Sequence, residues 1–308
     1  MKNIIAAVSM AALALTGSLM AHAQETMTAT HLKGTVTLPI APKRVVVLDY
    51  STLDTMQALG VEAEIALSKQ LCPSFISKYK DAKYTDVGGL KQFNLETVNA
   101  FKPDCIIISG RQADYYDELS KIAPVYVINR MDKEPLTAAL DDIKLIGQLF
   151  QKEEAAQAIV TKIEAAIART NAKAKASKKK ALVVLTNDGK IMAYGSGSRF
   201  GMVHDALGLE QVDTHIKTTG NHGQQVNYEY IALKNPDIIY VVDRSIAIGQ
   251  DSKSVKLVSN KLVTRTKAAK NDCIIQLTPA IWYLTGGGAT ATMTMVEEIE
   301  KGIDQASK

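Results

Sequence analysis

Hydrophobic residues in the first half of the chain occur in short unbroken runs, each followed by a stretch with helical periodicity. Residues 44–48 form one such run, and the helical pattern that follows through 53–59 ends at Gly60. Further apolar runs cover 105–109 and 125–128. Continuous apolar runs of this length are typical of parallel strands that are buried on both faces. The pattern therefore predicts an α/β fold.

The middle of the chain has a different pattern. Between 135 and 176, apolar residues recur at steps of three and four, and no proline interrupts them after Pro135. This spacing predicts one long amphipathic helix, or two helices nearly end to end. Apolar runs and helical patterns then resume at 181–186, 191–194, 238–242 and 291–303. We therefore predict two Rossmann-like lobes joined by a single long helix.

The first 23 residues have the pattern of an export signal. A basic start, Met1–Asn3, precedes a mostly apolar stretch, and Ala21–Ala23 matches the small-x-small pattern that signal peptidase cuts. A membrane anchor is disfavoured because the stretch ends in this cleavage pattern and not in a basic flank. We predict a soluble periplasmic protein after cleavage near Ala23. The predicted boundaries are a signal peptide at 1–23, an N-terminal lobe at 24–134, a linking helix at 135–176 and a C-terminal lobe at 177–308.

A weak internal repeat supports the two lobes. Four residues in the first half, Glu96, Pro103, Asp104 and Arg111, have identical counterparts 133 positions later, namely Glu229, Pro236, Asp237 and Arg244. Four matches at one offset are better explained by related lobes than by chance. Arg111 and Arg244 each follow a predicted strand, and ligands of open α/β sheets gather at the carboxyl ends of strands. We expect these two arginines to face each other across a cleft.

Charge and cysteine content exclude other classes of protein. The 308 residues carry 36 Lys and Arg against 32 Asp and Glu, and this net charge of +4 is too small for a protein that coats nucleic acid. Cys72, Cys105 and Cys273 are too few for a disulfide scaffold, and their odd number leaves at least one thiol free. The sequence has no Ser-His-Asp spacing, paired-carboxylate pattern or HExxH motif. It therefore does not indicate an enzyme.

Three further residues are candidates for ligand contacts. Arg199 lies in the glycine-rich turn 194–201, whose spacing is neither a dinucleotide fingerprint nor a Walker A loop, so a plain turn is the better interpretation. His222 lies in a loop between two glycines, and Tyr283 follows a predicted strand at 273–277. Each of the last two is weak evidence when it is considered alone.

These features together resemble the periplasmic ferric-siderophore binding proteins of ABC importers. The features that carry the resemblance are the leader, the opening Pro42–Val46, the two Glu…Pro-Asp copies and the linking helix. Within that family the chain is most similar to receptors for catecholates of the enterochelin and petrobactin type. The resemblance implies a monomer with no intrinsic cofactor, which binds Fe(III) as a siderophore complex and delivers it to an ABC permease.

The resemblance also implies roles for individual residues. Arg111, Arg199 and Arg244 would bind the catecholate, His222 and Tyr283 would complete the coordination of iron, and Glu96 and Glu229 would dock on the permease. Guanidinium groups suit anionic catecholate oxygens, and iron(III) accepts oxygen and imidazole ligands. A hexadentate siderophore leaves iron no free position, so protein ligands matter most for a tetradentate one. Apart from the resemblance, an acid in the first turn of a helix is simply favourable there.

Two other functions stay open from the sequence. One is a haem receptor with a tyrosine ligand, because arginines also suit haem carboxylates. The other is an exported α/β enzyme that binds a nucleotide at residues 195–201, although no general base lies near that loop. A divalent-metal receptor is less favoured because there is no His-rich loop. The long linking helix predicts only modest lobe closure, since a helix is stiffer than a loop hinge.

Overall fold

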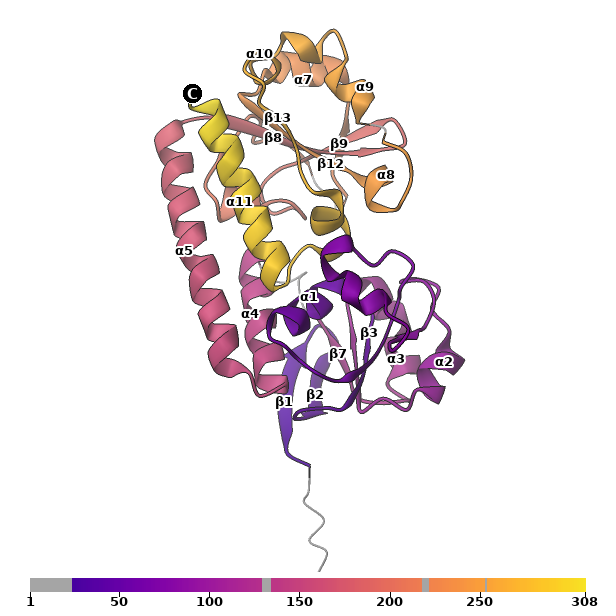
Figure 1. The fold of residues 1–308 in the computed structure, drawn as a ribbon. Coiled ribbons are helices and arrows are strands. Elements are labelled where there is room, and N and C mark those ends of the chain that lie inside the picture. Colours follow the sequence, from indigo (N-terminus) through magenta and orange to yellow (C-terminus); the bar gives the residue numbers. More distant parts are fainter. Residues whose placement is uncertain (1–23, 129–133, 218–221, 253) are drawn as a thin grey trace, which may run out of the picture.

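The computed structural model describes residues 24–128, 134–217, 222–252 and 254–308 (Figure 1). The predicted signal peptide lies outside the described residues. In the part of the chain that the structure describes, no helix has both the length and the apolar character needed to cross a membrane.

A parallel five-stranded sheet forms the N-terminal lobe, with the order β5-β4-β3-β6-β7. Its strands are β3 (Arg44–Val47), β4 (Glu64–Leu67), β5 (Thr85–Asp86), β6 (Cys105–Ile108) and β7 (Val125–Val127). Its helical segments are α1 (Tyr50–Ala58), η1 (Ser74–Lys80), α2 (Leu95–Ala100), η2 (Gly110–Tyr115) and α3 (Tyr116–Leu119). All four residues of β6 are buried, as expected for an unbroken apolar strand covered on both faces. An antiparallel hairpin of β1 (Thr26–His31) and β2 (Gly34–Pro39) precedes this sheet.

The C-terminal lobe has a mixed sheet with the order β11-β9-β8-β12-β13, and β10 also pairs with β8. Its strands are β8 (Lys180–Asn187), β9 (Lys190–Tyr194), β10 (Glu210–Gln211), β11 (Gln224–Val226), β12 (Ile238–Asp243) and β13 (Ile274–Gln276). Its helical segments are α6 (Met202–Asp205), α7 (Tyr228–Lys234), α8 (Arg244–Ala247), α9 (Val255–Val258), η3 (Val263–Arg265), α10 (Lys267–Lys270), η4 (Ala280–Thr285) and α11 (Ala289–Ala306). Both β8 and β12 are almost entirely buried, which confirms the two strands predicted there.

The interval 135–176, predicted as one linking helix or two helices nearly end to end, contains two helices that pack side by side. They are α4 (Pro135–Leu149) and α5 (Glu153–Ser177), and only α5 runs from one lobe to the other (Figure 1). Gln151 adopts a left-handed conformation at the turn, with φ of 54°. Gly147 permits the close packing, because a Cβ there would lie 2.4 Å from the Cβ of Ala156. Neither proline nor glycine stands at the turn itself, so the apolar periodicity concealed it.

The C-terminal helix α11 contacts both lobes. Asp54 of α1 is completely buried, and its Oδ2 accepts hydrogen bonds from the backbone N–H groups of Thr290 (2.8 Å) and Ala291 (2.9 Å). Burial raises the pKa of Asp54. Toward the other end of α11, Glu300 accepts two hydrogen bonds from Arg169 of α5, at 2.8 Å each. The Arg169 hydrogen bonds lower the pKa of Glu300 to about 2. The helix is therefore fixed to the N-terminal lobe at its start and to α5 further along.

The internal repeat corresponds to equivalent local structures. Asn94 caps α2 and Asn227 caps α7, and each side chain accepts a backbone hydrogen bond of 2.9 Å. Asp104 and Asp237 each accept a hydrogen bond of 2.9 Å from the first backbone N–H of a central strand, β3 and β8 respectively. Equivalent caps and turns therefore position the following strands, and with them the two arginines, in both lobes.

Candidate functional site

Three arginines from three elements surround one tyrosine. Arg111 lies on η2 after β6, Arg199 follows the turn after β9, and Arg244 begins α8 after β12. Their guanidinium carbons lie 6.0, 4.6 and 5.4 Å, respectively, from the centre of the Tyr283 ring. The structure thus brings together four of the five residues predicted to contact the ligand, and they come from both lobes.

Tyr283 lies on η4, a π-helical turn in which the N–H of Gly286 donates to the carbonyl of Ile281 at 2.6 Å. Carbonyl groups in the last turn of a helix have no partner within the helix, and π-turns are frequent at functional positions. Arg111 donates to the carbonyls of Tyr283 (2.6 Å) and Leu284 (2.9 Å), and Arg199 also donates to that of Tyr283. Because Arg111 belongs to the N-terminal lobe, these hydrogen bonds bridge the lobes.

Neutral groups accept the hydrogen bonds of Arg199 and Arg244. Arg244 donates to the Tyr283 hydroxyl at 2.8 Å and to the side-chain oxygen of Asn187 at 3.0 Å. Neither Arg199 nor Arg244 forms an ion pair with a carboxylate of the described residues. Burial and repulsion from Arg111 lower the pKa of Arg199 to about 10, which leaves it charged at neutral pH. These positive charges suit an anionic ligand.

Trp282, next to Tyr283, is held rigidly. It is buried, its Nε1 donates to Glu298 of α11 at 2.7 Å, and its ring meets that of Phe200 edge to face at 6.0 Å. The chain has one tryptophan. Its emission therefore reports on the immediate surroundings of the arginine cluster.

His222, the fifth predicted contact, is exposed just before β11. The next residue, Gly223, packs so closely on Tyr194 that a Cβ would lie 2.7 Å from the ring. Tyr194 contacts Phe200, whose ring lies 5.2 Å from the guanidinium carbon of Arg199. The backbone at His222 is therefore at the edge of the cluster, and the structure does not place its side chain among the arginines. Residues 218–221 of its loop lie outside the described residues.

Two backbone N–H groups of the glycine-rich turn at 194–201 already donate to side chains of the protein. Gly197 N–H donates to the Asp205 carboxylate at 2.8 Å, and Ser196 N–H donates to the Gln211 side chain at 2.9 Å. A phosphate at this position would have to displace a carboxylate. The turn therefore positions Arg199 and does not form the phosphate cradle that a nucleotide-binding enzyme needs.

Glu96 and Glu229 lie at equivalent positions away from the arginine cluster. Each is exposed in the first turn of its helix, α2 or α7, two residues after the capping asparagine. The three cysteines are buried free thiols.

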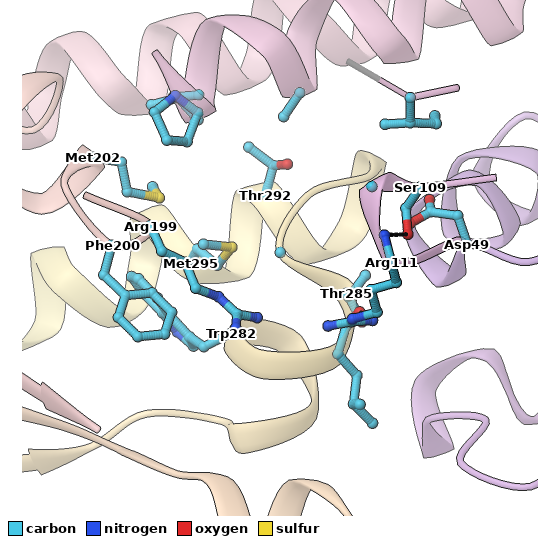
Figure 2. A pocket seen from close by; sticks show the side chains of 17 residues that line it. Asp49, Ser109, Arg111, Arg199, Phe200, Met202, Trp282, Thr285, Thr292 and Met295 are labelled. Atoms are coloured by element: carbon cyan, nitrogen blue, oxygen red, sulfur yellow. Dashed lines mark hydrogen bonds between the residues drawn. The ribbon is translucent and has the colours of Figure 1, made fainter. Parts of the chain in front are cut away.

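A partly open cavity of about 180 Å³ borders Arg111 and Arg199 (Figure 2). Its other walls include residues of α4, α11 and η4 together with Met202, and Asp49 and Ser109 border it on the side of Arg111. Sequence patterns gave no indication of this cavity, because its walls belong to elements far apart in the chain.

Two α/β lobes on a connecting helix, with arginines from both lobes meeting at the ends of their sheets, define a two-lobed ligand-binding protein. The model of the periplasmic binding protein family matches residues 45–281. The chain belongs to this family, as the sequence predicted.

Several similar proteins are named for the siderophore that they bind. The petrobactin-binding protein YclQ of Bacillus subtilis is 40% identical over 269 residues, which cover 87% of this chain and 84% of that protein. The ferric-anguibactin-binding protein FatB of Vibrio anguillarum is 32% identical over 278 residues, covering 88% and 86%. Among solved structures, the catecholate-siderophore binding protein VctP of Vibrio cholerae has a TM-score of 0.84 at 32% identity, covering 90% of this chain and all of that one. The structure of YclQ has a TM-score of 0.88 at 39% identity, covering 91% and 99%.

Proposed function

We propose that this protein binds a ferric catecholate siderophore between its lobes, as a periplasmic monomer released by cleavage near Ala23, and delivers it to an ABC permease. The observation that carries the proposal is the convergence of Arg111, Arg199 and Arg244 on Tyr283. The names of the petrobactin receptor and the catecholate-siderophore receptor among its relatives support it.

The chemistry of a ferric catecholate matches this cluster. The complex is a compact anion with oxygen atoms on its surface, and guanidinium groups offer several donors in a fixed planar arrangement. Mutual repulsion of Arg111 and Arg199 disfavours the charged form of Arg199 in the free protein. An anion between them offsets that repulsion, so binding gains both hydrogen bonds and relief of like-charge contacts.

Titration with ferric siderophores tests the proposal. We expect ferric catecholates to quench the emission of Trp282 on stoichiometric binding and to retain their catecholate-to-iron absorption band. Haem is the matched competitor, because its carboxylates also suit arginine. A Soret band on addition of haem, together with no quenching by any ferric catecholate, would contradict the proposal and favour a haem receptor.

We infer further that Tyr283 and His222 complete the coordination of iron in a tetradentate complex. The Tyr283 oxygen already lies among the arginines, where it accepts from Arg244. Replacing Tyr283 by phenylalanine and His222 by alanine together is expected to weaken binding of a ferric bis-catecholate about tenfold or more, since two metal ligands are lost. A hexadentate ferric tris-catecholate, which leaves iron no free position, is the control and should bind the variant as before. Equal affinity of the double variant and the parent for the bis-catecholate would exclude direct coordination.

A further inference from the structure

We propose that the cavity beside Arg111 and Arg199 is an inner subsite that accepts an uncharged arm of the ligand. This inference rests on the proposed function and specifies the class of ligand: a catecholate that carries an aliphatic or aryl arm with a hydrogen-bonding amide. The cavity of about 180 Å³ is far larger than the roughly 10–15 Å³ that one water needs. Of the four clustered residues, it borders only Arg111 and Arg199, so it extends the cluster on one side.

The walls away from the arginines are apolar and buried. They comprise Leu136 and Ala139 of α4, Met295 of α11, Met202 and Trp282, each at most 4% exposed. A charged group among these residues would lose its hydration without gaining a partner, whereas an uncharged arm removes apolar surface from water. The anionic head of the ligand therefore belongs on the guanidinium side, and the arm belongs in the cavity.

Thr292 adds to this wall a buried polar atom that has no partner among the described residues. Thr292 of α11 is 1% exposed, lines the cavity, and its Oγ1 has no hydrogen-bond partner in the described structure. Figure 2 shows Thr292, Met295 and the two guanidinium groups around the same space. A buried hydroxyl without a partner is costly, and buried polar atoms are normally satisfied. An amide in the arm of the ligand would supply that partner.

The length of the arm is tested with ferric complexes of N-methyl- and N-butyl-2,3-dihydroxybenzamide, which share one catecholamide head. Burial of one methylene is worth about fourfold in affinity. The butyl arm has three more methylenes than the methyl arm, so we expect the parent protein to prefer the butyl ligand by about sixtyfold when all three are buried. Ala139→Leu fills the cavity and should reduce this preference below about threefold, while affinity for the methyl ligand is unchanged. No preference in the parent, or an unaltered preference in the variant, would overturn the inference.

The role of Thr292 is tested with a second pair of arms of similar length, N-butyl and N-(2-acetamidoethyl). The near-isosteric Thr292→Val variant removes the hydroxyl and keeps the shape, so that folding is retained. We expect the parent to prefer the amide arm and the variant to prefer butyl, a change of about tenfold in the ratio of affinities. The same ratio in both proteins would overturn the assignment of the amide.

Binding of the methyl ligand distinguishes failure of the proposed function from failure of the inner subsite. Failure of its ferric complex to bind the parent at any concentration tested would count against the proposed function itself. Binding of this complex without any effect of the arm would leave the proposed function standing and remove the inner subsite alone.

Discussion

Replacing Arg199 by glutamine is expected to weaken the binding of a ferric catecholate about a hundredfold. A hydrogen bond to a charged partner contributes about 1.5–3 kcal/mol, and Arg199 offers more than one. Arg199 is more informative than Arg111 because Arg199 and Tyr283 belong to the same lobe. Arg111 also bridges the lobes, so its removal would change the structure as well as the charge. Isothermal titration or Trp282 quenching measures the effect.

Two variants control this experiment. Arg199→Lys retains the charge but not the planar arrangement of donors, and we expect it to lose about tenfold, between the parent and Arg199→Gln. Arg265→Gln removes an exposed arginine on η3 of the same lobe and should leave affinity unchanged. If Arg199→Gln and Arg265→Gln have the same affinity for the ferric catecholate, then the overall positive charge of the protein attracts the ligand. The arginine cluster would then have no specific role.

Replacing both Glu96 and Glu229 by alanine is expected to abolish uptake while the ferric ligand still binds with the parental affinity. Both side chains are exposed in the first turn of a helix, so their removal costs the fold little. Two acids at equivalent positions of related lobes can contact two equivalent subunits of a permease at once. Ligand uptake into cells or proteoliposomes measures transport, and titration of the purified variant measures binding.

The matched control is the replacement of Glu153 and Glu154, two exposed acids in the first turn of α5. This change removes the same charge from the same kind of position on another surface. Uptake should therefore remain at the parental rate. Undiminished uptake by the Glu96 and Glu229 variant would mean that the permease recognises a different surface.

The sequence predicted much of this architecture because the two lobes repeat one local design. Glu, Pro-Asp and Arg at a constant offset marked the helix start, the turn and the strand end in each lobe, and Asn94 and Asn227 confirm that equivalence. Such signals are local, so they are visible without knowledge of the tertiary structure. The position of Arg111 and Arg244 at the carboxyl ends of central strands follows from them.

Features that depend on contacts between distant segments were missed. The turn between α4 and α5 depends on Gly147 meeting Ala156, and an apolar pattern that continues on both sides gives no sign of it. Asp54 was not noticed because its partners, Thr290 and Ala291, lie more than two hundred positions away. Local sequence does not distinguish Thr292 from other helix residues, because the cavity beside it is formed by segments far apart in the chain.

The attachment of α11 gives the two lobes a second helical connection beside α5. α5 runs from one lobe to the other. α11 lies against it, with its start bound to Asp54 and its Glu300 bound to Arg169 of α5. Two helical connections restrict rotation of one lobe relative to the other more than a single helix does. We therefore expect the distance between Glu96 and Glu229 to change little when a ligand binds. On that expectation, a permease that contacts both residues would recognise the loaded protein through contacts at the cleft and not through the distance between the lobes.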